Sequence, residues 1–187
     1  MNKKTETQDL RLRMKLKPER IFQMRVAGLG FCDGHLLVHR AVHETFWTLP
    51  GGRAEFGEDS AQTLRREMME ELGVEVTVGR LLWVVENFFS YEGSDWHELG
   101  FYYLMELPGQ FPFDREDIVH RVHDEHPLEF RWIPATAAGL KAFDLPPYFL
   151  SNEIESLPGS TRHVVWDDNN LRSDTSRKRF RQPLPVK

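Results

Sequence analysis

Three glutamates and an arginine lie close together in the run RREMMEEL, residues 65–72. On a helix, Glu67, Glu70 and Glu71 fall within about 100° of one another at 3.6 residues per turn, so their carboxylates share one face. Like charges at these spacings repel by ~0.2–0.5 kcal/mol per pair. Arg66 can offset part of that repulsion, and a hard divalent cation, which prefers oxygen ligands, can offset more. The simpler interpretation is an acidic helix face exposed to solvent.

The surrounding residues predict the helix that would carry these carboxylates. Asp59 or Ser60 can cap its N-terminus, and Gln62 stands at the capping-box spacing from Asp59. Gly73 can end the helix, because glycine adopts the left-handed cap conformation without a Cβ penalty. Apolar residues recur at spacings of three and four, at Ala61, Leu64, Met68 and Leu72. We therefore expect a helix over residues 60–72.

A glycine and a further glutamate precede this helix at fixed distances. The order is Gly52, five residues, Glu58, seven residues and then Arg66. The whole pattern resembles the signature of the Nudix hydrolases, in which the last part is REUxEExGU and U is bulky and apolar. Met68 and Val74 fill the apolar positions, and the residues matching the fixed positions are Gly52, Glu58, Arg66, Glu67, Glu70, Glu71 and Gly73. Agreement at so many positions favours a functional helix over a merely solvated one.

The resemblance implies a fold and a reaction. The fold is α/β (α+β), a Nudix-type α/β/α sandwich with a mixed central sheet. The reaction is the attack of water on phosphorus in a diphosphate that joins a nucleoside to another group, with Mg²⁺ or Mn²⁺ as cofactor. Such chemistry requires that the charge of the diphosphate be neutralised and that the water be held in line.

Position in the signature also implies roles for individual residues. Glu70 and Glu71 are implied as the principal metal ligands. Glu67 is implied as a further ligand or as the group that orients water. Glu58 is implied beside the metal, and Arg66 as the residue that orients a glutamate through a charge-assisted bond.

Two further roles fall outside the helix. The backbone carbonyl of Gly51 or Gly52 is implied as an additional metal ligand. The general base is either a glutamate of the signature, with Glu67 first, or a residue of the acidic loop 108–127, in which Glu125 is our choice. The same loop residues are also explained as a solvated acidic connection.

A predicted hairpin after the helix supplies candidate substrate contacts. Phe89 and Tyr91 could stack on a nucleobase, although aromatic strand residues more often pack in a core. Arg53, beside the glycines, could hold phosphate. Glu86 and Glu98 are expected to face each other across the hairpin, where either could act as the base, and a charge at the rim is the better explanation of each.

The substrate class is inferred from charge. Few fixed cations are evident near the signature, so a two-phosphate substrate with an uncharged remainder is favoured, of the ADP-ribose or nucleotide-sugar type. Nucleoside triphosphates and dinucleoside polyphosphates are the alternative substrates. A Nudix ligand-binding module without turnover is another alternative, but such modules commonly lose glutamates that this chain retains. A prenyl diphosphate isomerase should need a catalytic cysteine, and Cys32 lies in a predicted turn.

Turn signals and hydrophobic periodicity divide the rest of the chain. Strands are expected at 21–31, 36–40, 74–89, 96–107, 128–133 and 161–166, with helices at 135–142 and 147–157. Residues 108–127 are expected to be irregular. A Nudix hydrolase domain is expected over 21–166, after a mobile polar arm at 1–20 and before a basic, disordered tail at 167–187.

The composition fits one domain with tails. Hydrophobic residues make up 40% of the 187, enough to bury a core. A formal charge of −5 argues against a protein that coats nucleic acid, and no segment has the character of a signal peptide or membrane span. A single cysteine excludes an internal disulfide. We expect a cytoplasmic enzyme whose partner is a small-molecule nucleotide, and the resemblance is compatible with a homodimer.

Overall fold

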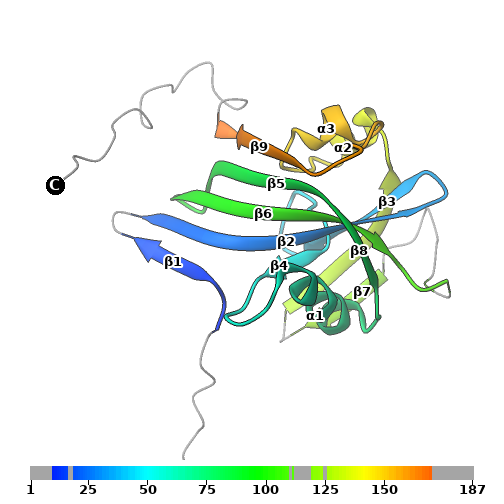
Figure 1. Ribbon diagram of the computed structural model, residues 1–187, viewed down its shortest axis with the longest axis horizontal. Helices are drawn as coiled ribbons and strands as arrows, with labels where there is room; N and C mark the ends of the chain where they lie inside the picture. Colours follow the sequence, from blue (N-terminus) through cyan, green and yellow to red (C-terminus); the bar gives the residue numbers. More distant parts are fainter. Residues whose placement is uncertain (1–9, 17–18, 110, 112–118, 124–125, 170–187) are drawn as a thin grey trace, which may run out of the picture.

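A mixed β-sheet runs through the centre of the computed structural model (Figure 1). The structure describes residues 10–16, 19–109, 111, 119–123 and 126–169. Its elements are β1 Arg13–Leu16, β2 Arg20–Cys32, β3 His35–Ala41, β4 Gly51–Arg53, α1 Ser60–Leu72, β5 Thr77–Tyr91, β6 Ser94–Glu106, β7 Val119–His123, β8 His126–Pro134, α2 Ala137–Ala142, α3 Leu150–Glu153 and β9 Arg162–Asp167. The strand order is β7-β8-β3-β2-β6-β5-β9, and β1 and β4 also pair with β2.

Helices cover both faces of this sheet, with α1 on one side and α2 and α3 on the other (Figure 1). The apolar stripe of α1 is buried in a cluster with residues of β2, β6 and β8. The opposite core brings Leu140 of α2 and Leu150 of α3 together with Trp83 and Val85 of β5. This arrangement confirms the predicted α/β/α sandwich.

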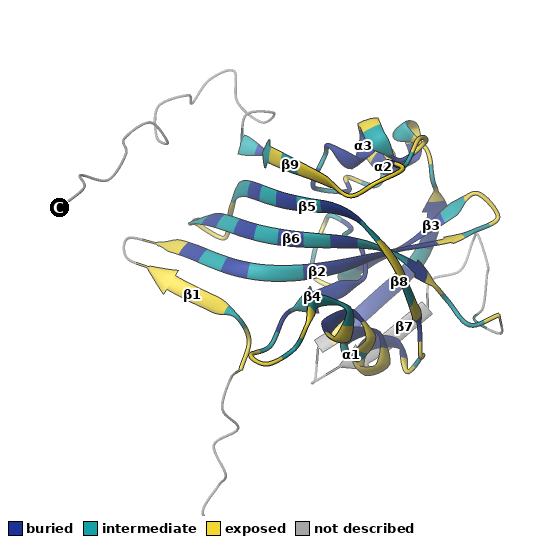
Figure 2. Ribbon diagram, in the orientation of Figure 1, coloured by how far each residue is buried: buried dark blue, intermediate teal, exposed yellow. Residues whose placement is uncertain are grey.

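β2 contributes to both layers, because side chains of a strand alternate between the two faces. Val26 belongs to the cluster under α1, while Ala27 and Leu29 belong to the core under α2 and α3. By the same alternation, Gln23 and Arg25 share a face with Ala27. Figure 2 shows buried and half-buried segments along β2, β5 and β6. Polar side chains therefore lie on central strands, on the face towards α2 and α3.

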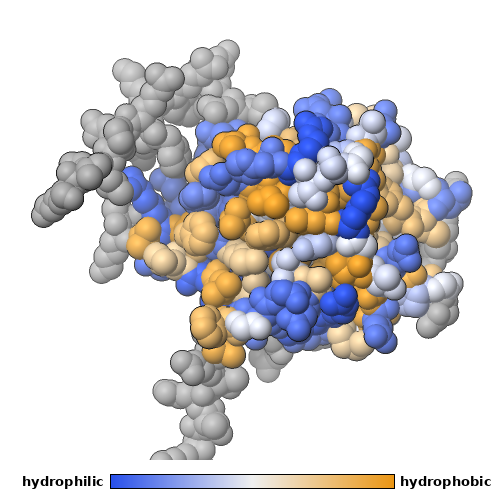
Figure 3. Space-filling view, viewed as in Figure 1, coloured by the Kyte–Doolittle hydropathy of each residue, from blue (hydrophilic) through white to orange (hydrophobic). Residues whose placement is uncertain are grey.

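Local signals predicted α1 closely. The Asp59 side chain accepts a hydrogen bond from the Gln62 amide, and the Asp59 amide donates to the Gln62 side chain, which completes the capping box. Gly73 ends the helix in the left-handed conformation, with φ of 69°. Figure 3 shows polar side chains gathered over α1. No helix in the described part of the chain is long and apolar enough to cross a membrane.

Three expected segments differ from the structure. Residues 13–16, expected in a mobile arm, form β1, because their backbone pairs with β2 although all four side chains are exposed. Residues 119–123, expected to be irregular, form β7 by pairing with β8. The helix expected over 147–157 is limited to α3, whose N-cap residue Phe149 makes no side-chain capping bond. β1 and β7 each have only four or five residues and lack a periodic apolar pattern, so the sequence gives no strand signal there.

The register of the β5–β6 hairpin differs by one residue from the expected one. Glu98 lies opposite Asn87, and Glu86 lies opposite Leu99. A shift of one residue moves a side chain to the other face of a sheet. Glu86 is consequently on the outer face near His163, whereas Glu98 is buried. The interpretation of Glu98 as a rim charge is therefore wrong.

The two adjacent methionines of α1 test this packing. Met68 is 0% exposed and Met69 is 50% exposed. We expect Met68→Ala to lower the free energy of unfolding by roughly 2–5 kcal/mol, because it leaves a cavity under the sheet. The matched control Met69→Ala should change it by less than about 0.5 kcal/mol. Urea denaturation followed by circular dichroism measures both, and equal losses would contradict the assigned helix face.

Candidate active site

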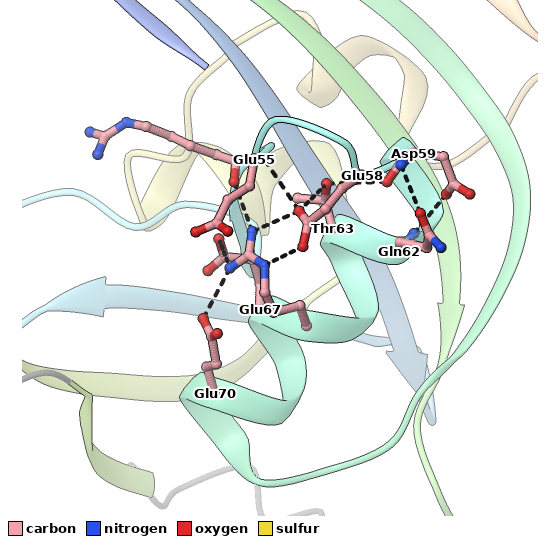
Figure 4. Close-up of polar contacts among 9 residues, drawn as sticks. Glu55, Glu58, Asp59, Gln62, Thr63, Glu67 and Glu70 are labelled. Atoms are coloured by element: carbon pink, nitrogen blue, oxygen red, sulfur yellow. Dashed lines mark hydrogen bonds and ion pairs between the residues drawn. The ribbon is translucent and has the colours of Figure 1, made fainter. Parts of the chain in front are cut away.

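The carboxylates of Glu58, Glu67 and Glu70 lie around one guanidinium group (Figure 4), which is that of Arg66. Its Nε donates to Glu58 Oε1 at 2.7 Å, and its Nη1 donates to Glu67 Oε1 at 2.9 Å and to Glu70 Oε2 at 3.0 Å. Nη2 donates to the backbone carbonyl of Arg53 at 3.0 Å. One guanidinium thus joins the helix to the preceding loop and to β4.

The ionisation of this network follows from its contacts. Hydrogen bonds from Arg66 lower the pKa of Glu58 more than partial burial raises it. Burial by itself would lower the pKa of Arg66, but the bond to Glu58 and the charge of Glu67 outweigh burial and raise it. Glu58 and Arg66 therefore form a permanent ion pair beside the site.

Glu67 is held in a confined position. A Cβ on Gly52 would lie 2.1 Å from the carboxyl carbon of Glu67, so only glycine leaves room for that carboxylate. Burial raises the pKa of Glu67, and the charge of Glu71 raises it further. Two buried, mutually repelling carboxylates favour a bound cation.

Glu71 provides the observation most relevant to a metal. It is buried, and its Oε2 has no hydrogen-bond partner in the described part of the structure. His39 Nδ1 lies 3.2 Å from this oxygen, but the contact lacks hydrogen-bond geometry. A buried carboxylate oxygen without a donor is a suitable ligand for a hard cation. The alternative of a wholly solvated acidic face is therefore wrong for Glu67 and Glu71.

The donor set fits Mg²⁺ or Mn²⁺ in chemistry, since every candidate ligand is an oxygen. Among the described residues, no three His, Cys, Asp or Glu side chains are grouped to hold a metal ion as they stand. Arg66 instead engages Glu58, Glu67 and Glu70. The structure brings these glutamates to one place, beside Glu71 and Gly52.

A pocket of about 570 Å³ lies on the sheet face opposite α1. The three predicted substrate contacts, Arg53, Phe89 and Tyr91, all line it. Phe89 stacks on Trp96 with ring centroids 5.7 Å apart, and Tyr91 donates a hydrogen bond to Glu44. Arg53 connects the pocket to the signature, because its carbonyl accepts from Arg66.

More arginines lie at the pocket than the sequence analysis expected. Arg25 pairs with Arg53 across β2 and β4, and both line the pocket. Burial lowers the pKa of Arg53, and the charges of Arg13, Arg25 and Arg11 lower it further, so four guanidinium groups lie within electrostatic range. The expectation of few fixed cations is wrong. The sequence signal for this site was Arg25, a charged residue within a largely apolar predicted strand.

The pocket also has buried polar residues: Glu98, which the sequence offered as a candidate base, and Gln23, Asn87 and Asp168, which sequence reasoning did not assign to the site. Gln23, Glu98 and Asn87 are register partners across β2, β6 and β5. Asp168 was expected in a disordered tail, but it is buried and accepts from Trp166 Nε1 at 2.6 Å. The candidate base Glu125 lies outside the described residues.

Curated proteins with similar sequences include pyrophosphatases and diphosphatases by name. Putative ADP-ribose pyrophosphatase YjhB of Bacillus subtilis is 36% identical over 62 residues, 33% of this chain and 30% of that protein. The 8-oxo-dGTP diphosphatase of Proteus vulgaris is 36% identical over 73 residues, 36% of this chain and 65% of that one. The chain thus spans less than two thirds of the length of these relatives.

Solved structures share the fold. A NUDIX hydrolase from Nitrosomonas europaea superposes with a TM-score of 0.51 at 18% identity, covering 71% of this chain and 87% of that one. The MutT protein from Methanosarcina mazei Go1 gives a TM-score of 0.50 at 20% identity, covering 72% and 93%. The family model of the NUDIX domain matches residues 22–149, well over half of the chain. This chain therefore belongs to the Nudix family.

Proposed function

We propose that this chain is a divalent-metal-dependent hydrolase that cleaves a diphosphate bond in a nucleoside diphosphate linked to another group. The observation that carries the proposal is the buried pair Glu67 and Glu71, with an unpartnered Glu71 oxygen, within a complete Nudix signature. Family membership and the diphosphatase and pyrophosphatase names of the relatives support it.

Each signature residue has a proposed role. Glu70 and Glu71 are the principal metal ligands, and Glu67 is a further ligand or orients water. Glu58 lies beside the metal, and Gly52 contributes its carbonyl. When bound, Mg²⁺ or Mn²⁺ supplies positive charge against the diphosphate and lowers the pKa of water. The chain contributes the fixed orientation of these oxygens, which Arg66 maintains through its bonds to Glu58 and Glu67.

The general base is proposed to be Glu125, with Glu67 as the alternative. Burial raises the pKa of Glu67, which suits a group that accepts a proton near neutral pH. Glu67 is also a proposed ligand, and a carboxylate engaged by a cation is a weaker base, so a separate base is favoured.

For the substrate, we propose the ADP-ribose or nucleotide-sugar type first. The name of the Bacillus relative supports it. The second candidate is a nucleoside triphosphate or dinucleoside polyphosphate. Arg25 and Arg53 in the pocket, with Arg11 and Arg13 nearby, specifically favour the second candidate, because they supply cationic charge for additional phosphates.

Glu71→Gln tests the metal site. A neutral amide is a poorer ligand for a hard cation, so we expect kcat to fall by roughly 100-fold or more while the fold is retained. The control Glu75→Gln alters an exposed carboxylate just after the helix and should retain turnover. Kinetics with Mg²⁺ and Mn²⁺ check both variants, and near-normal turnover of Glu71→Gln would remove the residue from the site.

Gly52→Ala tests the position of Glu67. The added methyl would overlap the Glu67 carboxylate, so we expect activity to fall at least about tenfold, since displacement by 1 Å is costly in catalysis. Gly159→Ala is the matched control, because a Cβ there has nothing within 4 Å. Activity at saturating metal is the measurement. Equal activity of the two variants would show that the position of Glu67 is not required.

The substrate order is tested by steady-state kinetics with Mg²⁺. We expect a higher kcat/KM for ADP-ribose and nucleotide sugars than for nucleoside triphosphates and dinucleoside polyphosphates. The reverse order would assign the arginines to additional phosphates and select the second candidate. A chain that binds these compounds with no turnover in either metal would be a ligand-binding module.

A further inference from the structure

One buried acceptor in the pocket has no hydrogen-bond partner among the described residues. It is Oδ1 of Asn87, a residue that is 4% exposed and lines the cavity. The Nδ2 of the same amide donates to Asp168 Oδ2 at 3.4 Å. A carboxylate only accepts hydrogen bonds, so this contact sets the amide with Nδ2 towards Asp168 and leaves Oδ1 for another donor.

Asp168 is itself held in place. Its Oδ1 accepts from Trp166 Nε1 at 2.6 Å and from the Tyr148 amide at 3.3 Å. The position of the Asp168 carboxylate therefore sets the orientation of the Asn87 side-chain amide. Because Asp168 follows β9 and Asn87 lies within β5, this contact also joins two distant parts of the chain.

Glu98 lies directly beside Asn87. The two residues are opposite partners in the antiparallel β5–β6 pair, so their Cβ atoms are about 4.5–5.5 Å apart on the same face. Gln23 donates to the Glu98 carboxylate. Burial raises the pKa of Glu98, and the charge of Asp168 also raises it, against the opposing effects of Arg25 and Gln23. The Glu98 carboxyl therefore lies next to the Asn87 amide among the residues that line the pocket.

Cationic side chains are connected to this group. Arg53 Nε donates to Gln23 Oε1 at 2.8 Å, and Gln23 donates in turn to Glu98. The backbone of Arg53 on β4 is three strand spacings, or about 14 Å, from that of Asn87 on β5, with β2 and β6 between. Aromatic side chains also line the pocket, with Phe46 and Tyr91 in edge contact at 5.9 Å. The pocket thus combines arginines, aromatic walls and the hydrogen-bonding groups of Asn87 and Glu98.

We propose that Asn87 and Glu98 form the floor of a nucleobase site that selects a base with an exocyclic amino group. In it, Asn87 Oδ1 accepts from the amino group and the Glu98 carboxyl contacts the adjacent ring nitrogen. Asp168 is a positioning residue that orients the amide. The inference rests on the proposed function only in taking the ligand to be a nucleotide.

The amino group is selected because the unpartnered atom is an acceptor. Adenine, guanine and cytosine each carry an amino group, whereas hypoxanthine and uracil do not. A base that offers only a carbonyl at this position would leave Asn87 Oδ1 unpartnered, and buried unpaired groups discriminate strongly against such analogues. A ribose hydroxyl could also donate to Asn87 Oδ1, but such a contact would not discriminate between bases, because the compared nucleotides carry the same ribose.

Binding of nucleoside monophosphates tests the site separately from hydrolysis, because these compounds contain no diphosphate bond. Isothermal titration of the full chain would compare adenosine monophosphate with purine riboside monophosphate, guanosine with inosine monophosphate, and cytidine with uridine monophosphate. We expect the amino member of at least one pair to bind roughly tenfold more tightly. That ratio should fall to about one in Asn87→Leu.

Asn152→Leu is the matched control, because Asn152 is exposed on α3, and it should keep the preference. If Asn87→Leu does not fold by circular dichroism, Asn87→Ser replaces it, since the shorter side chain withdraws the acceptor. Equal binding within all three pairs, or a preference that survives both Asn87 substitutions, would overturn the proposal, the former pointing to a ribose contact. Amino preference without any hydrolysis of diphosphate compounds would uphold this inference and refute the proposed function.

Discussion

The bonds of Arg66 are the interaction on which the geometry of the signature depends. A guanidinium offers five N–H donors in a rigid planar fork, which suits several oxygen acceptors at once. Here the acceptors are Glu58, Glu67, Glu70 and the carbonyl of Arg53. The middle of α1, the preceding loop and β4 are therefore fixed relative to one another. A lysine at this position would present a single charge and could not hold all of these groups.

The bonds of Arg66 explain why the Glu67 carboxylate lies so close to Gly52. Because Arg66 holds Glu67 on one side, the carboxylate lies over Gly52 on the other, where a side chain would overlap it. Glu71 then occupies a buried position with an unpartnered oxygen. Buried carboxylates oppose folding unless they are compensated. Such local conflicts are typical of functional sites, where stability is given up for a prepared arrangement of charge.

The pocket also brings charged and polar side chains together, on the sheet face opposite α1. Arg53 donates to Gln23, and Gln23 donates to Glu98, which lies opposite Asn87. β2 links these groups because one face of the strand carries Gln23, Arg25 and Ala27 in succession. The pocket therefore holds cationic and hydrogen-bonding side chains in one connected network.

The local sequence determined where α1 begins and ends and which residues share its faces. The capping box, the glycine stop and the carboxylate face depend on residues three or four apart, whose spacing is set by helix geometry. The signature also identified the family, and turn and apolar signals located six of the strands along the chain. Arg53, Phe89 and Tyr91, proposed from the sequence as substrate contacts, line one pocket, since each lies near the signature or in the strongly predicted hairpin.

Tertiary structure decided the rest, because it depends on which strands pair and in which register. A register different by one residue put Asn87, rather than Glu86, opposite Glu98. Pairing of β1, β2 and β4 gathered arginines that are far apart along the chain, and β9 brought Asp168 beneath Asn87. No local pattern specifies such contacts, since alternation predicts which residues share a face but not which strands lie side by side.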